Sequence, residues 1–262
     1  MKFVDAHIHL SDPEYGQKIG SVIEDAKASN VVAVVSNSID LKTSVLSLQL
    51  AEEYPGLVYA ALGIHPWNIG HLSPNEIQDT VGLISQHATS KEGLVAVGEI
   101  GLDPQYGKSE ELHNLQLLVF DKMLHAAEKS NLPVIIHSRG SQSEILRLLP
   151  SYSLKGVLLH WFGGSVELLP QIMDRGYYIS EGPTSVYSDK TREIIRQVAI
   201  NNFLTETDGP VRFSGPFKGR MTTPSFILPV VRAVAELKEM RETEVADQIL
   251  QNFRQLFRVD VT

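Results

Sequence analysis

The sequence contains no cysteine and no long apolar run. The first absence excludes disulfide bonds, thiolate zinc sites and cysteine nucleophiles, and it is consistent with a reducing compartment. A membrane span requires roughly 18 consecutive apolar residues, and no segment approaches that length. The N-terminal segment MKFVDAHIHL carries Asp5 and two histidines among its apolar residues, unlike a signal peptide. We therefore expect a soluble, cytoplasmic protein without a membrane partner, and no segment indicates an obligate protein partner.

Basic residues are fewer than acidic residues in this chain. Lys and Arg number 23 against 31 Asp and Glu, which gives a formal net charge of −8. Such a surface repels nucleic acid at long range, so a local patch or a metal ion would have to hold any polyanionic substrate. The first predicted strand is not followed by a G-x-G-x-x-G motif, which counts against a dinucleotide-binding fold.

Short apolar segments alternate with helix-like segments along the whole chain, and no linker-like change of composition divides them. The apolar segments are rich in Val, Ile and Leu, as expected for parallel strands covered on both faces. The predicted strands are 3–8, 30–37, 57–64, 94–100, 133–138, 156–161, 176–180 and 202–208. This alternation predicts a single α/β domain over residues 1–262, folded as one (β/α)₈ TIM barrel.

Helix signals lie between these strands. Ser73-Pro74 provides an N-cap followed by proline at the first helical position. Residues 109–130 place apolar side chains on one helical stripe. Residues 222–258 predict two helices, the first opened by Thr223-Pro224.

Ionisable residues lie at the C-terminal ends of the predicted strands, where (β/α)₈ barrels carry their active sites. Alternate residues of a strand point to the same side, so both histidines of the first strand face the barrel interior. A buried, unpaired carboxylate is costly, and a divalent metal ion compensates its charge. Four imidazoles and two carboxylates are sufficient ligands for two ions about 3.5–4 Å apart, and Glu99 is placed to bridge them. The predicted ligands are His7, His9, Glu99, His137, His160 and Asp208.

Each of these residues also has a simpler explanation when it is taken alone. A histidine such as His137 is usually a hydrogen-bonded core residue, and Glu99 could pair with a basic side chain. Asp208 precedes Gly209-Pro210 and could simply begin a turn. The simpler explanations would have to hold independently on five strands, always at the same end. The common position therefore favours a metal centre.

Several segments, taken in their order along the chain, resemble the TatD-type metal-dependent hydrolases, a branch of the amidohydrolase superfamily. The segments are DAHIHL (5–10), GIHPW (63–67), GEIGLD (98–103), Q-x₃-F (116–120) with AAEKSNLPVIIHSR (126–139), HWFGG (160–164) and TETDGP (205–210). They cover nearly the whole chain. The resemblance divides the predicted ligands into one set of His7, His9 and Asp208, a second set of His137 and His160, and the shared ligand Glu99.

The resemblance also implies catalytic roles. Asp208 would contact the nucleophilic water as general base, which agrees with the ability of a carboxylate to accept a proton there. Many amidohydrolase relatives bridge their metal ions with a carboxylated lysine on the fourth strand. Glu99 stands at that place in this chain, so the site should need no carbon dioxide for its assembly.

Further residues are candidates for substrate binding. His65, after the third strand, is either a proton donor or phosphate ligand, or a turn histidine bonded to the backbone. Arg139 is a candidate phosphate clamp because a guanidinium pairs with two phosphate oxygens, although a solvent-exposed ion pair is the alternative. Arg220 lies with Arg212 and Lys218 in a basic loop that could contact substrate or simply be solvated.

Aromatic residues lie in the same loops. Trp67, Tyr106 and Trp161 could stack on a nucleobase, although packing is the commoner role of such residues. Glu206 has the same strand parity as Asp208 but lies deeper, so it is a candidate for orienting a ligand histidine.

The leading functional hypothesis is hydrolysis of DNA phosphodiester bonds, exonucleolytically from single-stranded ends, by a metal-activated hydroxide. Asp208 would be the general base, with Glu99 and His65 as further catalytic residues. The alternative uses the same centre on a carboxylic ester, a lactone or an amide, including an aminoacyl ester of tRNA. A non-catalytic adaptor is the third hypothesis, but the complete ligand set argues against it. The expected cofactors are two divalent ions, Mg²⁺, Mn²⁺ or Zn²⁺.

Overall fold

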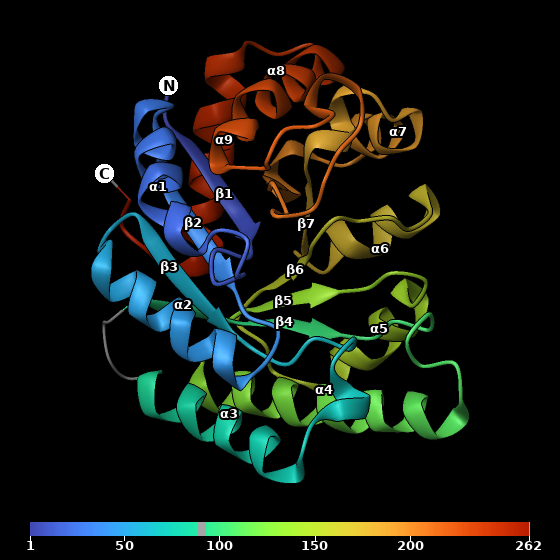
Figure 1. Cartoon of the computed structure of the whole chain (residues 1–262). Helices are drawn as coiled ribbons and strands as arrows, with labels where there is room; N and C mark the ends of the chain where they lie inside the picture. Colours follow the sequence, from blue (N-terminus) through green and yellow to red (C-terminus); the bar gives the residue numbers. More distant parts are fainter. Residues whose placement is uncertain (89–92, 262) are drawn as a thin grey trace.

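A computed structural model describes residues 1–88 and 93–261. Within these ranges, eight parallel strands pair side by side in sequence order and curve into a nearly closed barrel (Figure 1). All eight predicted strands are confirmed. The strands are β1 (Phe3–Ile8), β2 (Val31–Asn37), β3 (Val58–Leu62), β4 (Leu94–Gly101), β5 (Val134–His137), β6 (Val157–Leu159), β7 (Tyr178–Glu181) and β8 (Phe203–Thr205). The fold is a (β/α)₈ TIM barrel.

Helices α1 to α7 connect successive strands, α8 and α9 follow the last strand, and the helices lie outside the barrel (Figure 1). They are α1 (Ile19–Ala28), α2 (Leu41–Glu53), α3 (Pro74–His87), α4 (Glu110–Ser130), α5 (Gln142–Leu148), α6 (Leu169–Asp174), α7 (Asp189–Gln197), α8 (Ile227–Lys238) and α9 (Glu242–Phe257). Ser73 caps α3 as predicted, since its hydroxyl accepts a hydrogen bond from the backbone N–H of Glu76. None of the helices in the described ranges is long and apolar enough to cross a membrane.

The two predicted C-terminal helices are α8 and α9. Thr223-Pro224 opens a short 3₁₀ turn, Pro224–Phe226, and α8 begins only at Ile227. The proline lacks the N–H that an interior helical position would use, which suits it to this first turn.

The strands are apolar throughout because the barrel interior covers one face and the helices cover the other. Every residue of β4 is buried, for example. The outer helices present one apolar stripe each to the sheet, and α8 buries Val230, Val231 and Val234 in this way. The main core of the described residues therefore occupies both the barrel interior and the layer between strands and helices.

The last strand meets the first through its C-terminal extension. The backbone N–H of Asp208 donates to the carbonyl of His7 at 2.8 Å, and His9 donates to the carbonyl of Gly209, also at 2.8 Å. The buried carboxylate of Asp5 accepts hydrogen bonds from both the backbone N–H and the hydroxyl of Thr207, at 3.0 and 2.5 Å. This closure fixes Asp208 beside His7 of β1 and His9, which follows it.

Candidate metal centre and active site

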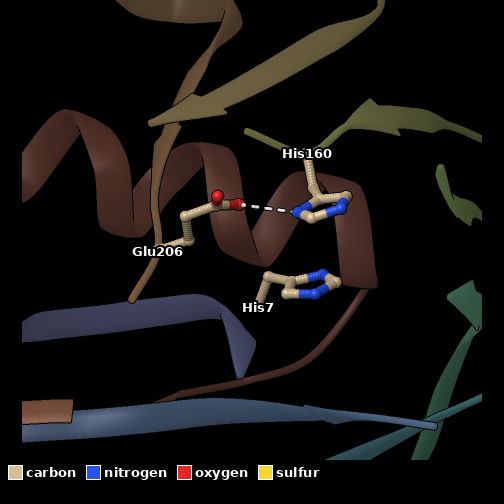
Figure 2. Close-up of side chains that lie close together, drawn as sticks. All are labelled: His7, His160 and Glu206. Carbon is tan, nitrogen blue, oxygen red and sulfur yellow. Dashed lines mark ion pairs between the residues drawn. The ribbon is translucent and has the colours of Figure 1, made fainter. Parts of the chain in front are cut away.

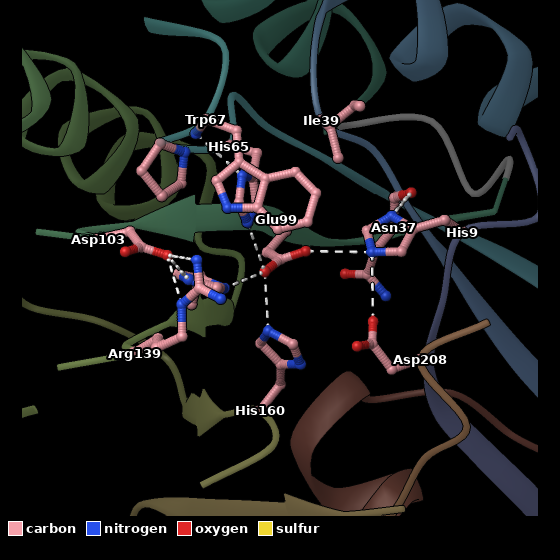
Figure 3. A network of polar contacts seen from close by, with 12 residues as sticks. His9, Asn37, Ile39, His65, Trp67, Glu99, Asp103, Arg139, His160 and Asp208 are labelled. Carbon is pink, nitrogen blue, oxygen red and sulfur yellow. Dashed lines mark hydrogen bonds and ion pairs between the residues drawn. The ribbon is translucent and has the colours of Figure 1, made fainter. Parts of the chain in front are cut away.

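The six predicted metal ligands come together at the C-terminal mouth of the barrel, and Figure 3 labels four of them, His9, Glu99, His160 and Asp208. Each lies at or just beyond the end of its strand, and the strand tilt of the barrel turns these ends toward a common point. The residues are His7 from β1, His9 directly after β1, Glu99 from β4, His137 from β5, His160 after β6 and Asp208 after β8.

The carboxylate of Glu99 lies at the centre of the network (Figure 3). One of its oxygens, Oε1, lies 2.7 Å from Nε2 of His160, 2.9 Å from Nδ1 of His137 and 3.1 Å from Nε2 of His65. His65 therefore lies in contact with the cluster of six predicted ligands. Glu99 is 2% exposed, so protein donors rather than bulk water surround this carboxylate.

The other oxygen of Glu99 faces a separate group of donors. Its Oε2 atom lies 3.3 Å from Nε2 of His7 and 3.3 Å from Nε2 of His9. Oδ1 of Asp208 lies 3.4 Å from each of these nitrogens, which are 3.2 Å apart. Donor atoms at the corners of a tetrahedron with bonds of about 2.0–2.1 Å are about 3.3–3.4 Å apart. Nε2 of His7, Nε2 of His9 and Oε2 of Glu99 could therefore hold one divalent ion, and Oδ1 of Asp208 lies at a similar distance from both nitrogens.

Two of the ligand histidines, His9 and His137, have an acceptor at the ring nitrogen that points away from Glu99. Nδ1 of His9 lies 3.1 Å from the backbone carbonyl of Asn37, and Nε2 of His137 lies 2.8 Å from Oδ2 of Asp103. A carbonyl or carboxylate can only accept, so these outer nitrogens carry the protons. Nε2 of His9 and Nδ1 of His137, which face Glu99, can therefore present lone pairs only to a bound cation or proton.

Glu206 lies behind the ring of His160 (Figure 2). Its Oε2 atom accepts a hydrogen bond from the hydroxyl of Ser180 at 2.5 Å and lies 3.6 Å from Nδ1 of His160. The imidazoles of His160 and His7 stack almost parallel, with ring centroids 3.8 Å apart. The stacked ring of His7 and the Glu206 carboxylate together restrain the orientation of the His160 ring.

The histidines of the cluster lower the pKa values of its two carboxylates. Burial alone would raise the pKa of Glu99, but His65, His160 and His7 outweigh it and hold the pKa well below its usual value. Burial likewise opposes ionisation of Asp208, and the hydrogen bonds of its histidine neighbours, His7 first, lower its pKa. Both carboxylates are therefore ionised near neutral pH and available to a cation.

His9 compensates these negative charges when no ion is bound. Burial lowers the pKa of His9, but the hydrogen bonds to Asp208 and Glu99 raise it to about 10. A divalent ion must displace the proton that His9 then carries, so metal binding releases protons. Metal affinity should consequently decrease as the pH falls.

His65 differs from His9 in its protonation state. Its Nδ1 atom accepts the backbone N–H of Trp67 at 3.1 Å, which leaves the proton on the Nε2 atom that faces Glu99. Burial, the largest effect, lowers the pKa of His65 to about 4. The ring is therefore neutral near neutral pH, and it offers an N–H hydrogen-bond donor to the cavity.

A cavity of about 730 Å³ opens above this cluster. Arg139 lies on one wall, where its Nε and Nη2 atoms both donate to Oδ2 of Asp103, at 2.9 and 2.7 Å. Arg212 and Trp161 lie on the wall formed by the loops after β8 and β6. The cavity therefore combines a cluster of metal-type ligands with cationic and aromatic side chains.

Comparison with known proteins identifies the family. The family model described as TatD related DNase matches residues 4–258. The chain belongs to the TatD family. Its relatives within that family include the metal-dependent hydrolase YabD of Bacillus subtilis, which is 32% identical over 98% of this chain and 99% of YabD. Human deoxyribonuclease TATDN3 is 31% identical over 97% of this chain and 94% of its own length.

The fold comparison agrees. The crystal structure of YjjV, a TatD homologue from Escherichia coli K12, superposes with a TM-score of 0.89 and 28% identity over 98% of each chain. The protein is thus a metal-dependent hydrolase of the TatD family with histidine and glutamate clusters that could hold metal ions.

Two predicted substrate residues of this TatD-family protein pack against aromatic side chains of the loop after β8. Arg220 is outside the lining of the cavity, with its guanidinium carbon 4.6 Å from the centre of the Phe226 ring. Trp161 lines the cavity, but its ring also packs 5.6 Å from that of Phe213 in a small aromatic core of the 211–226 loop. Arg220 therefore lies outside the cavity lining, and its role in substrate binding stays a prediction.

Two residues of the site are absent from the sequence-based prediction. Asp103 connects the predicted ligand His137 with Arg139, and it could have been found as the acidic residue that ends the GEIGLD segment after β4. Asn37 contributes its backbone carbonyl to His9, and a carbonyl gives no signal in the sequence.

Proposed function

We propose that this TatD-family protein is a deoxyribonuclease that hydrolyses phosphodiester bonds at unpaired DNA ends. The observation that carries the proposal is the carboxylate of Glu99, whose two oxygens face two separate groups of ligand atoms. A site for two ions beside a cationic side chain suits a negatively charged phosphodiester. The name of human TATDN3, a deoxyribonuclease, supports DNA as the substrate.

The donor set fits two divalent ions. His7, His9 and Asp208 would hold one ion, His137 and His160 would hold the other, and Glu99 would contribute to both. Imidazoles suit Zn²⁺, whereas carboxylates and phosphate suit Mg²⁺ and Mn²⁺. Ions bound there would neutralise phosphate charge and make water a stronger nucleophile near neutral pH.

The side chains of the protein itself supply the remaining steps. The ionised carboxylate of Asp208 lines the cavity and accepts the proton of the attacking water. The neutral Nε2–H of His65 lies 3.1 Å from Oε1 of Glu99, and with metal ions on that carboxylate it would be available to donate a hydrogen bond to a phosphate oxygen. Arg139 is fixed by Asp103, and its unused N–H groups can pair with the same phosphate.

A time course on short single-stranded DNA tests the proposed function. Two oligonucleotides, one labelled at each end, are incubated with protein and Mg²⁺ or Mn²⁺, and the products are resolved at single-nucleotide length. We expect progressive shortening of one labelled strand, complete loss of activity with chelator and recovery after metal is returned. Internal cuts would contradict the exonucleolytic mode. If the metal-loaded protein does not shorten DNA but hydrolyses a simple carboxylic ester, DNA is the wrong substrate.

Removal of the Arg139 guanidinium should weaken substrate binding more than chemistry. We expect Arg139→Ala to raise KM for a phosphodiester about tenfold, since a charge-assisted hydrogen bond contributes about 1.5–3 kcal/mol and Arg139 is partly exposed. KM for a neutral ester should hardly change. Arg232→Ala is the matched control, because Arg232 is also ion-paired but lies outside the cavity lining. Equal changes of KM on both substrates would contradict the phosphate clamp.

A further inference from the structure

Two large aromatic side chains lie exposed beside the cavity. Trp67 and Tyr106 are 43% and 45% exposed, and their ring centroids are 5.3 Å apart with a tilt of 44°. The other exposed large apolar side chains of the described residues lie apart from the cavity lining. Adjacent exposed aromatic rings are costly in water unless a ligand covers them, and such patches mark binding sites.

The position of Trp67 relates this pair to the candidate metal centre. Trp67 lines the cavity, and its ring centroid lies 4.5 Å from that of His65 and 6.4 Å from that of His137. Figure 3 shows the residue on the side of Glu99 that also carries His65. A ligand group stacked on the indole would thus lie next to the place proposed for the reacting phosphate.

A positive charge accompanies the aromatic pair. The guanidinium carbon of Arg139 lies 5.5 Å from the centre of the Tyr106 ring, and Asp103 holds the guanidinium in place. An apolar ligand would gain little from this charge, whereas a nucleotide carries both a flat ring and an anionic phosphate. The combination of a stacking surface, a cation and a cluster of metal-type ligands therefore favours a nucleotide as the ligand.

We propose that Trp67, supported by Tyr106, forms a stacking subsite for the unpaired nucleobase next to the scissile phosphate. This inference rests on the proposed function and names the part of the DNA that the site recognises. Stacking on Trp67 needs a free base face, which a base inside a duplex lacks because its neighbours cover both faces. Every base has such a face, so the subsite prefers unpaired ends without selecting a sequence.

Tryptophan fluorescence tests the subsite without turnover. The sequence contains two tryptophans, Trp67 and Trp161, so Trp161→Phe leaves Trp67 as the sole reporter and Trp67→Phe leaves Trp161. Each variant is titrated with deoxyadenosine 5′-monophosphate and with 2-deoxyribose 5-phosphate, which lacks a base, in Mg²⁺ and with excitation that adenine does not absorb. We expect saturable quenching by the nucleotide in Trp161→Phe and a several-fold smaller change in Trp67→Phe. Competition should show the sugar phosphate binding about tenfold more weakly. Equal affinity for the two ligands, or quenching only of Trp161, would overturn the subsite.

Kinetics on single-stranded DNA give a second readout. Trp67→Ala should raise KM about tenfold with little change in kcat, and Trp67→Phe should restore most of the loss because phenylalanine keeps a stacking face. An oligonucleotide with an abasic residue at each end should not distinguish Trp67→Ala from wild type. Leu118→Ala, which removes another exposed apolar side chain outside the cavity lining, is the control.

The two proposals can fail separately. If wild type degrades DNA and Trp67→Ala has an unchanged KM, the nuclease function stands and the subsite is wrong. If wild type does not degrade DNA but the nucleotide quenches Trp67, the proposed function is wrong and the subsite belongs to another nucleotide substrate.

Discussion

Asp208→Asn is expected to lower kcat on single-stranded DNA by at least about 10³-fold. Loss of a general base typically costs about 10²–10⁴ in rate, and the same substitution removes a negative charge from the proposed ligand set. An asparagine amide cannot accept the proton of the attacking water at neutral pH. KM should change far less than kcat, because the phosphate and base contacts proposed for Arg139 and Trp67 remain.

Asparagine is the suitable replacement because of the backbone at this position. Asp208 has φ 50°, a left-handed conformation that asparagine tolerates well, and its N–H donates to the carbonyl of His7. The circular dichroism spectrum should therefore be unchanged. Asp247→Asn, an exposed substitution on α9, is the control and should retain full activity. A rate for Asp208→Asn near that of wild type would remove Asp208 from the role of base.

The fold could be predicted from the sequence because its signals are local. Strands covered on both faces must be apolar throughout, and each short run of Val, Ile and Leu followed by a helical segment met this condition. The strand boundaries were less certain, since β8 ends at Thr205 although the predicted segment continued to residue 208. Asp208 is instead held by hydrogen bonds to β1, a contact between distant parts of the chain that periodicity does not encode.

The membership of the ligand cluster could also be predicted, because residues at the same end of parallel strands must meet in a barrel. The sequence did not predict the orientation of each ring. That depends on partners such as Asp103 and the carbonyl of Asn37, which come from other strands or from the backbone. These partners decide which imidazole nitrogen faces Glu99. They are contacts between residues far apart in the sequence, so the sequence alone does not reveal them.

Loop residues were the least predictable part of the site. The sequence predicts the same substrate-binding role for Arg220 and Trp161, because both lie in loops that follow strands with predicted ligands. In the structure, the 211–226 loop forms an aromatic core of its own, and Arg220 lies against Phe226 in it. Side-chain packing among loop residues has no period, so composition alone could not separate a residue of the cavity from a neighbour outside it.

Glu99→Gln should lower the metal content of the protein more than any substitution outside the cluster. Glutamine has nearly the shape of glutamate, so packing is preserved, but its amide is neutral and presents a donor to histidine lone pairs on one side. Both oxygens of Glu99 face groups of ligand atoms, so we expect both ions to bind more weakly. The expected loss of affinity is at least about 100-fold, because loss of a residue that only orients a ligand already costs about 10–100-fold. Mass spectrometry after gel filtration should find about two ions per chain in wild type and at most one in Glu99→Gln.

Thermal unfolding separates weak metal binding from a damaged fold. A ligand that binds only the folded state stabilises it by about 2.7 kcal/mol at 100 times its Kd, so wild type should gain Tm when metal is added and Glu99→Gln should gain far less. Glu144→Gln is the matched control, since Glu144 also contacts a histidine, His113 at 3.3 Å, but lies outside the cavity lining. Its metal content and its metal-dependent Tm should equal those of wild type. An unchanged stoichiometry in Glu99→Gln, with an unchanged gain in Tm, would show that the histidines and Asp208 hold the ions without a bridging carboxylate.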